Sequence, residues 1–200
     1  MTKIKICGLT RPQDIAYVNE ARPDFIGFIL LFPKSRRNLT PEQAAVLRRE
    51  LDPAIRAVGV FVDQPAETVL AAAERIGLDV IQLHGQEDAA YIREIQHVSG
   101  LPVWKAFRIR TPADLSAAAA SPANAVLLDN GYGTGEVFDW TLAEAFQRPF
   151  YLAGGLTPEN ISDAVHTLHP ALVDLSSGVE TAGCKDRSKI IAAVKAAHAI

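Results

Sequence analysis

The sequence predicts a single-domain α/β protein, a (β/α)8 or TIM barrel that spans residues 1–200. Three observations lead to this prediction. Eight short apolar segments alternate with helical patterns along the chain, and most are almost continuously apolar, as parallel strands covered on both faces are. Each strand–helix unit has about 25 residues, the lower size limit of such a barrel. No Gly/Ser-rich or Pro-rich linker divides the chain.

The first predicted strand covers residues 3–7, where Ile4 and Ile6 alternate with Lys3, Lys5 and Cys7. This period of two gives the strand two different faces. The other strands begin near Phe25, Ile55, Val80, Val103, Ala125, Phe150 and Leu172. An open, doubly wound sheet is the alternative architecture, but it favours a Gly-x-Gly-x-x-Gly turn after the first strand, and residues 7–11 have no such turn.

Helix start signals lie between the predicted strands. Thr40-Pro41-Glu42-Gln43 is a capping box with proline at the first helical position. Thr111-Pro112 and Thr157-Pro158 repeat the Thr-Pro start, and Pro65 opens a helix that Gly77 ends. Further helices are expected over residues 14–21, 89–98, 142–146 and 187–197.

Composition narrows the functional classes. The formal net charge is −3, and the one basic cluster, residues 34–37, is short, so it favours a small anion over a nucleic acid as binding partner. No apolar segment reaches membrane-spanning length, and the N-terminus lacks the apolar region of a signal peptide. The two cysteines have no metal-ligand spacing. We therefore expect a cytoplasmic protein without a metal, another cofactor or a membrane partner.

Two groups capable of acid–base chemistry end predicted strands. Cys7 ends the first strand and Asp129 ends the sixth, and in a parallel barrel both positions lie at the end where active sites are built. A thiol and a carboxyl group that face one cavity can form an acid/base pair. Each residue also has a structural interpretation, Cys7 as a small buried side chain and Asp129 as a capping or turn residue.

Small residues follow the last two predicted strands. Gly154 and Gly155 follow the seventh strand, and Ser177 and Gly178 follow the eighth. Such residues expose backbone N–H groups, and in barrels these two loops commonly bind phosphate. The alternative is a pair of tight turns.

Three further features concern charged or titratable side chains. A guanidinium in the basic loop, Arg37, is suited to hold a substrate carboxylate, although a solvated loop fits the charge equally well. His84 ends the fourth strand and is either a substrate contact or a structural residue. Lys5 and Asp174 lie on strands that become neighbours when a barrel closes, which predicts a structural ion pair.

Several motifs together resemble those of the phosphoribosylanthranilate isomerase family of tryptophan biosynthesis. They occur in the family's order from the first strand to the last helix, and they are Lys5-Ile6-Cys7-Gly8-Leu9-Thr10, Pro33-Lys34-Ser35-x-Arg37, Val58-Gly59-Val60-Phe61, Gln82-Leu83-His84-Gly85, Gly133-Thr134-Gly135-x-x-Phe138-Asp139-Trp140, Gly154-Gly155-Leu156 and Asp174-x-Ser176-Ser177-Gly178-Val179-Glu180. The set is specific, whereas no single motif is.

The resemblance implies a (β/α)8 barrel that performs the Amadori rearrangement of N-(5-phosphoribosyl)anthranilate, a small-molecule substrate. It implies Asp129 as general acid, Cys7 as general base and Arg37 as the ligand of the anthranilate carboxylate. A thiol must be partly ionised to act as base, so we expect its surroundings to lower its pKa. The segment before Pro33 is one residue longer than is common, which leaves Arg36 as the alternative carboxylate ligand.

The residues alone leave other functions open. A barrel that only binds a phosphosugar would need neither Cys7 nor Asp129. A phosphosugar epimerase would need metal-binding histidines at several strand ends, where only His84 is so placed, and a barrel like indoleglycerol-phosphate synthase would need lysines there. We expect a monomer or a homodimer.

Overall fold

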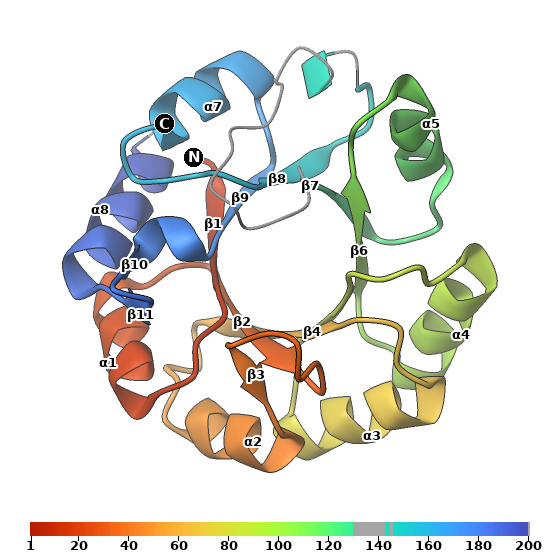
Figure 1. Cartoon of the computed structure of the whole chain (residues 1–200), viewed down its shortest axis with the longest axis horizontal. Helices are drawn as coiled ribbons and strands as arrows, with labels where there is room; N and C mark the ends of the chain where they lie inside the picture. Colours follow the sequence, from red (N-terminus) through yellow and green to blue (C-terminus); the bar gives the residue numbers. More distant parts are fainter. Residues whose placement is uncertain (130–142, 145, 200) are drawn as a thin grey trace.

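The computed structural model describes residues 1–129, 143–144 and 146–199, and all structural statements concern these residues. Eight parallel strands form the barrel (Figure 1): β1 (Lys3–Cys7), β2 (Phe25–Leu30), β4 (Arg56–Phe61), β5 (Val80–Leu83), β6 (Val103–Arg108), β7 (Ala125–Asp129), β8 (Phe150–Ala153) and β9 (Leu172–Leu175). The sheet closes because β1 pairs with both β2 and β9. The predicted barrel is therefore confirmed.

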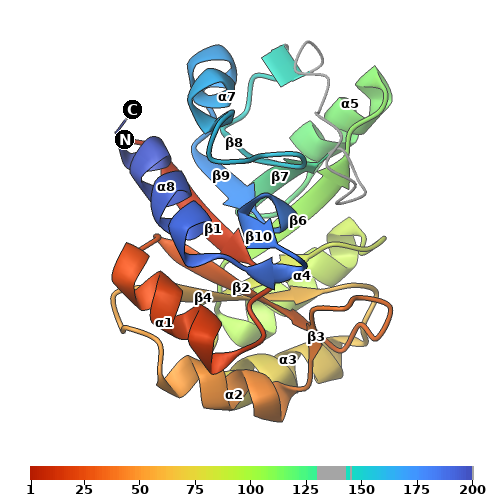
Figure 2. The ribbon, with the colours of Figure 1, turned by 60° about the vertical axis from the view of Figure 1, so that its left-hand side comes forward.

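The helices form a ring outside the strands (Figure 1): α1 (Pro12–Ala21), α2 (Pro41–Arg49), α3 (Ala66–Ile76), α4 (Ala89–Ser99), α5 (Pro112–Ala120), α7 (Ile161–Leu168) and α8 (Arg187–His198). The first and last helices, α1 and α8, lie side by side (Figure 2). Of the predicted helix over residues 142–146, residues 143–144 are helical, whereas residues 142 and 145 lie outside the described residues.

Local capping explains most helix boundaries. At α2, Gln43 N donates to Thr40 Oγ1 and Thr40 N donates to Gln43 Oε1, so the predicted capping box is confirmed. Gly77, with φ 70°, ends α3 as predicted. The helix expected at Thr157-Pro158 begins three residues later, because the Asn160 side chain accepts from Thr157 N and holds a turn before α7.

Alternate residues of each strand fill the barrel interior. Near the N-terminal ends of the strands, one buried layer closes the barrel and consists of Phe25, Val58, Val80, Trp104, Ala125 and Leu172, with Tyr151 packed against it. Trp104 makes edge-to-face contacts with both Phe25 and Tyr151. Because this layer is packed, the interior is open only toward the C-terminal ends of the strands.

Three short elements follow β9 and were not predicted. A 3-10 turn, η1 (Ser177–Val179), leads into a hairpin of β10 (Glu180–Thr181) and β11 (Cys184–Lys185) (Figure 2). Another short strand, β3 (Asn38–Leu39), extends the sheet beside β2. Among the described residues, every helix is too short or too polar to span a lipid bilayer.

Candidate active site

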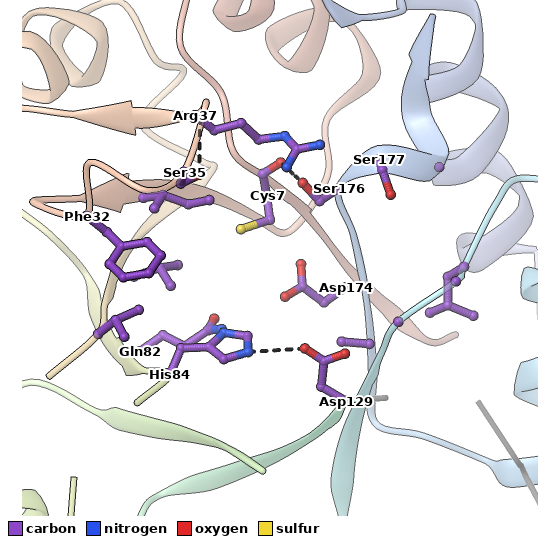
Figure 3. Close-up of a pocket in the computed structure, with 18 of the residues that line it drawn as sticks. Cys7, Phe32, Ser35, Arg37, Gln82, His84, Asp129, Asp174, Ser176 and Ser177 are labelled. Carbon is purple, nitrogen blue, oxygen red and sulfur yellow. Dashed lines mark hydrogen bonds and ion pairs between the residues drawn. The ribbon is translucent and has the colours of Figure 1, made fainter. Parts of the chain in front are cut away.

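A cavity of about 350 Å³ opens at the C-terminal ends of the strands (Figure 3). All eight residues that the sequence singled out for chemistry or binding line it: Cys7, Arg37, His84, Asp129, Gly154, Gly155, Ser177 and Gly178. They come from six segments that are far apart in the chain. The closed barrel brings them together because the ends of all its strands surround one opening.

The thiol of Cys7 stands at the end of β1 and is 8% exposed. Burial raises the pKa of this thiol above its ordinary value, and Asp174 raises it further, whereas Lys5 and Lys185 act in the opposite direction. The expectation that the surroundings lower this pKa is therefore wrong in its net direction. Burial, which the motif does not reveal, outweighs the two ammonium groups.

The carboxyl group of Asp129 ends β7, with its side chain 14% exposed. His84 Nε2 lies 3.1 Å from Asp129 Oδ2, and His84 Nδ1 lies 3.4 Å from Gln82 Nε2. With the imidazole proton on Nε2, His84 donates to Asp129 and accepts from Gln82. His84 thus holds the carboxyl group at the cavity wall, opposite Cys7 in Figure 3.

The two loops of small residues converge on one side of the cavity. Gly154 and Gly155 have φ values of 93° and 67°, which residues with a Cβ adopt only at a cost. A Cβ on Gly178 would overlap the backbone carbonyl of Leu156, so the η1 loop packs directly on the loop after β8. The small residues of both loops therefore lie together at one edge of the cavity.

The basic loop places its two arginines differently. The side chain of Arg37 is 19% exposed and lines the cavity, whereas that of Arg36 is 58% exposed and does not line it. Arg37 donates to both carboxylate oxygens of Glu180, with Nε–Oε1 2.7 Å and Nη2–Oε2 2.9 Å. Lys185 Nζ donates to the same carboxylate at 2.9 Å and to the backbone oxygen of Ser176 at 2.8 Å. The geometry favours Arg37 over Arg36 as a ligand for bound substrate.

The family model of N-(5'-phosphoribosyl)anthranilate (PRA) isomerase matches residues 4–196. The chain belongs to this family. It is 44% identical over 197 residues to an N-(5'-phosphoribosyl)anthranilate isomerase of Caldanaerobacter subterraneus subsp. tengcongensis, with 95% of each chain covered.

Solved structures of phosphoribosylanthranilate isomerases are similar over the whole length. One, in complex with reduced 1-(o-carboxyphenylamino)-1-deoxyribulose 5-phosphate, is 35% identical with a TM-score of 0.88 and 100% coverage of both chains. Another is of monomers derived from the dimeric enzyme of Thermotoga maritima, at 36% identity, a TM-score of 0.88 and 100% coverage of both chains. As a member of the phosphoribosylanthranilate isomerase family, the chain is an isomerase.

The sequence analysis of this phosphoribosylanthranilate isomerase family member did not predict Gln82 as a cavity residue, and it predicted Asp174 only as a structural partner of Lys5. Gln82 and Asp174 lie on the cavity floor, and among the described residues Gln82 Oε1 and Asp174 Oδ1 are buried acceptors without a hydrogen bond. The contact of Glu180 with Arg37 was also not predicted. The predicted Lys5–Asp174 pair is present, with Nζ–Oδ2 2.8 Å.

Two remaining points concern residues or groups outside this description. The motif Gly133-Thr134-Gly135-x-x-Phe138-Asp139-Trp140, which the resemblance used, lies outside the described residues. Within the described ranges, no three His, Cys, Asp or Glu side chains cluster as metal ligands.

Proposed function

We propose that the protein converts N-(5-phosphoribosyl)anthranilate to 1-(2-carboxyphenylamino)-1-deoxyribulose 5-phosphate in tryptophan biosynthesis. The observation that carries this proposal is the single cavity lined by Cys7, Asp129, Arg37 and the two loops of small residues. The reaction needs an acid, a base, a cation for the carboxylate and a site for the phosphate, and the cavity has a candidate for each of them.

Asp129 is the general acid in this proposal. Its proton goes to the furanose ring oxygen as the bond from that oxygen to C1′ breaks, and the lone pair of the anthranilate nitrogen forms an iminium with C1′. His84 supports this step, because its hydrogen bond to Asp129 Oδ2 fixes the direction in which the carboxyl group points.

Cys7 is the general base. Its thiolate removes the C2′ proton, and the electrons of that C–H bond form the C1′=C2′ double bond while the iminium π electrons return to nitrogen. The resulting enolamine loses its hydroxyl proton and gains a proton at C1′, which gives the ketone without any redox partner. The raised pKa of the Cys7 thiol makes its thiolate a stronger base but a less abundant one at neutral pH.

Two anchors hold the ends of the substrate. The loops of Gly154, Gly155, Ser177 and Gly178 offer backbone N–H groups to the phosphate. Arg37 offers its remaining N–H donors to the anthranilate carboxylate, while Glu180 holds the guanidinium in place through Nε and Nη2. The relative that is crystallised with the reduced carboxyphenylamino product supports a ligand of this kind.

An activity assay tests the proposed function. Freshly generated phosphoribosylanthranilate is mixed with the purified protein. The loss of the fluorescence of this substrate and the formation of the ketose product are followed. Product formation by the natural chain, and its loss in the Cys7→Ala variant, would support the proposal. A natural chain that binds the phosphosugar without converting it would refute it.

We also propose a monomer or homodimer that works in the cytoplasm. The Thermotoga maritima relative is described as dimeric, which supports the second of these assembly states. Light scattering distinguishes a particle of 21.6 kDa from one of twice that mass.

A further inference from the structure

Lys5 is a buried charge directly below the proposed base. Its side chain has 0% exposure, and it lies two residues before Cys7 on the same face of β1. Among the described residues, it is one of the largest of the fully buried side chains. Its ammonium group donates to Asp174 Oδ2 at 2.8 Å. A buried ion pair seldom stabilises a fold more than apolar residues of the same volume do, so its presence here calls for another explanation.

The backbone of Gly27 shows how close Lys5 and Cys7 are. A Cβ placed on Gly27 would lie 2.8 Å from Cys7 Sγ and 3.1 Å from Lys5 Nζ. The sulfur and the ammonium nitrogen are therefore at most about 6 Å apart, a range over which one charge affects the ionisation of its neighbour. Gly27 is opposite Cys7 in the β1–β2 register, and the absence of a side chain there leaves room for both groups.

Other charged groups also face the thiol. Asp174 on β9 disfavours the thiolate, and Lys185 on β11 favours it less than Lys5 does. The same cavity contains Arg37, His84 and Asp129. Lys5 is thus the strongest positive influence on a thiol that its surroundings otherwise keep protonated.

We propose that Lys5 is a positioning residue of the reaction, whose buried ammonium group stabilises the thiolate of Cys7. The proposal rests on the assigned role of Cys7 as general base. Asp174 has a secondary role, because it keeps the ammonium group charged. Burial alone would lower the pKa of Lys5, but Asp174 and Cys7 outweigh burial and raise it, so Lys5 carries its proton throughout the neutral range.

Thiol alkylation tests this proposal without any turnover. The chain has two cysteines, and Cys184 is exposed on the hairpin, so a Cys184→Ser background leaves Cys7 as the only reactive thiol. The rate of reaction with iodoacetamide, measured from pH 6 to pH 11, then reports the thiolate fraction of Cys7. Lys5→Met, Asp174→Asn and Lys105→Met are compared in this background.

The proposal predicts a change in Lys5→Met that the other two variants do not match. Lys5→Met should slow alkylation at pH 8 by about tenfold and move the midpoint upward, because one pKa unit is a tenfold change in thiolate. Asp174→Asn should change the rate less, because it removes a carboxylate that disfavours the thiolate and also a partner that keeps Lys5 charged. Lys105→Met is the matched control: Lys105 is also a buried lysine in an ion pair, with Nζ 3.2 Å from Glu87 Oε2, and its change should leave the midpoint in place.

Several outcomes would overturn the proposal. An unchanged midpoint in Lys5→Met, or equal shifts in Lys5→Met and Lys105→Met, would show that Lys5 has a structural role only. Equally slow alkylation in Lys5→Met and Asp174→Asn would point to a general loss of packing. Should Lys5→Met fail to fold, the double variant Lys5→Met/Asp174→Leu removes both charges together and should still react more slowly than the background, by a smaller factor because the carboxylate that disfavours the thiolate is lost as well.

The proposed function and this inference can be refuted independently of each other. If Cys7→Ala retained activity, Cys7 would not be the base, yet the alkylation result for Lys5 would still stand. If both are right, Lys5→Met also moves the acid limb of the pH profile of kcat upward and recovers activity at high pH.

Discussion

The two arginines of the basic loop give a paired test of how the substrate carboxylate is bound. Arg37→Ala removes a mostly buried guanidinium from the cavity wall, whereas Arg36→Ala removes an exposed one that contacts the same carboxylate of Glu180. Losing the partner of a partly buried carboxylate costs about 2–4 kcal/mol of transition-state binding. That corresponds to a decrease of about 30- to 900-fold in kcat/KM.

Arg36→Ala is the matched control for this test. Exposed ion pairs contribute about 0–1 kcal/mol, so kcat/KM should fall by less than about sixfold. Reduced 1-(o-carboxyphenylamino)-1-deoxyribulose 5-phosphate, which a relative binds, and its analogue without the carboxylate serve as inhibitors. Arg37→Ala should weaken the first inhibitor strongly and the second hardly at all.

Two results would refute this reasoning. If Arg36→Ala is the damaged variant, the longer segment before Pro33 has shifted the carboxylate ligand by one residue. If neither variant discriminates between the two inhibitors, another group holds the carboxylate.

Three further predictions concern the acid, the base and the phosphate. Cys7→Ala and Asp129→Ala should each lower kcat by about a hundredfold or more with an unchanged circular dichroism spectrum, and near-normal turnover would remove that residue from the mechanism. Gly155→Asp should raise the inhibition constant of inorganic phosphate by about tenfold, because it adds bulk and negative charge beside the backbone donors. An unchanged constant would place the anion elsewhere. Since only the thiolate of Cys7 accepts the C2′ proton and burial raises the pKa of this thiol, kcat/KM should fall as pH drops below that pKa and still be rising at pH 8. A profile already flat at pH 7 would contradict this.

Periodicity and strand order were sufficient to predict the barrel and to place the candidate residues at strand ends around one cavity. The alternation of Ile4 and Ile6 with Lys5 and Cys7 separates the helix-facing side of β1 from the interior side. Once eight such strands close, their C-terminal ends meet at one opening. Cys7 and Asp129 each lie at a strand end, so they can be placed at the same cavity even though the sequence does not give their distance in space.

Contacts between loops were not predictable in the same way. The Arg37–Glu180 pair joins residues 143 positions apart, and no repeating pattern marks the hairpin that carries Glu180. The hydrogen bond between His84 and Asp129 depends on how two side chains turn at the ends of β5 and β7, which are separated by β6. The pKa of Cys7 depends on the balance between burial and the charge of Lys5. The sequence identifies these two residues but does not show how deeply they are buried.

Alternate residues of each strand face the barrel interior, and this explains why charged side chains occur inside it. On the interior face, Phe25 and Leu172 belong to the closed apolar layer, while Lys5 and Asp174 lie nearer the open end and Cys7 and Ser176 line the cavity. β1 and β9 pair Lys5 with Asp174 directly, so the ammonium group is neutralised without contact with water. An apolar pair at this level would fill the space equally well but would remove the strongest group that opposes the effect of burial on the thiol of Cys7, and burial favours the protonated form. The position of the pair, directly below the proposed base and above the packed layer, is therefore better explained by the chemistry of the cavity than by the stability of the barrel.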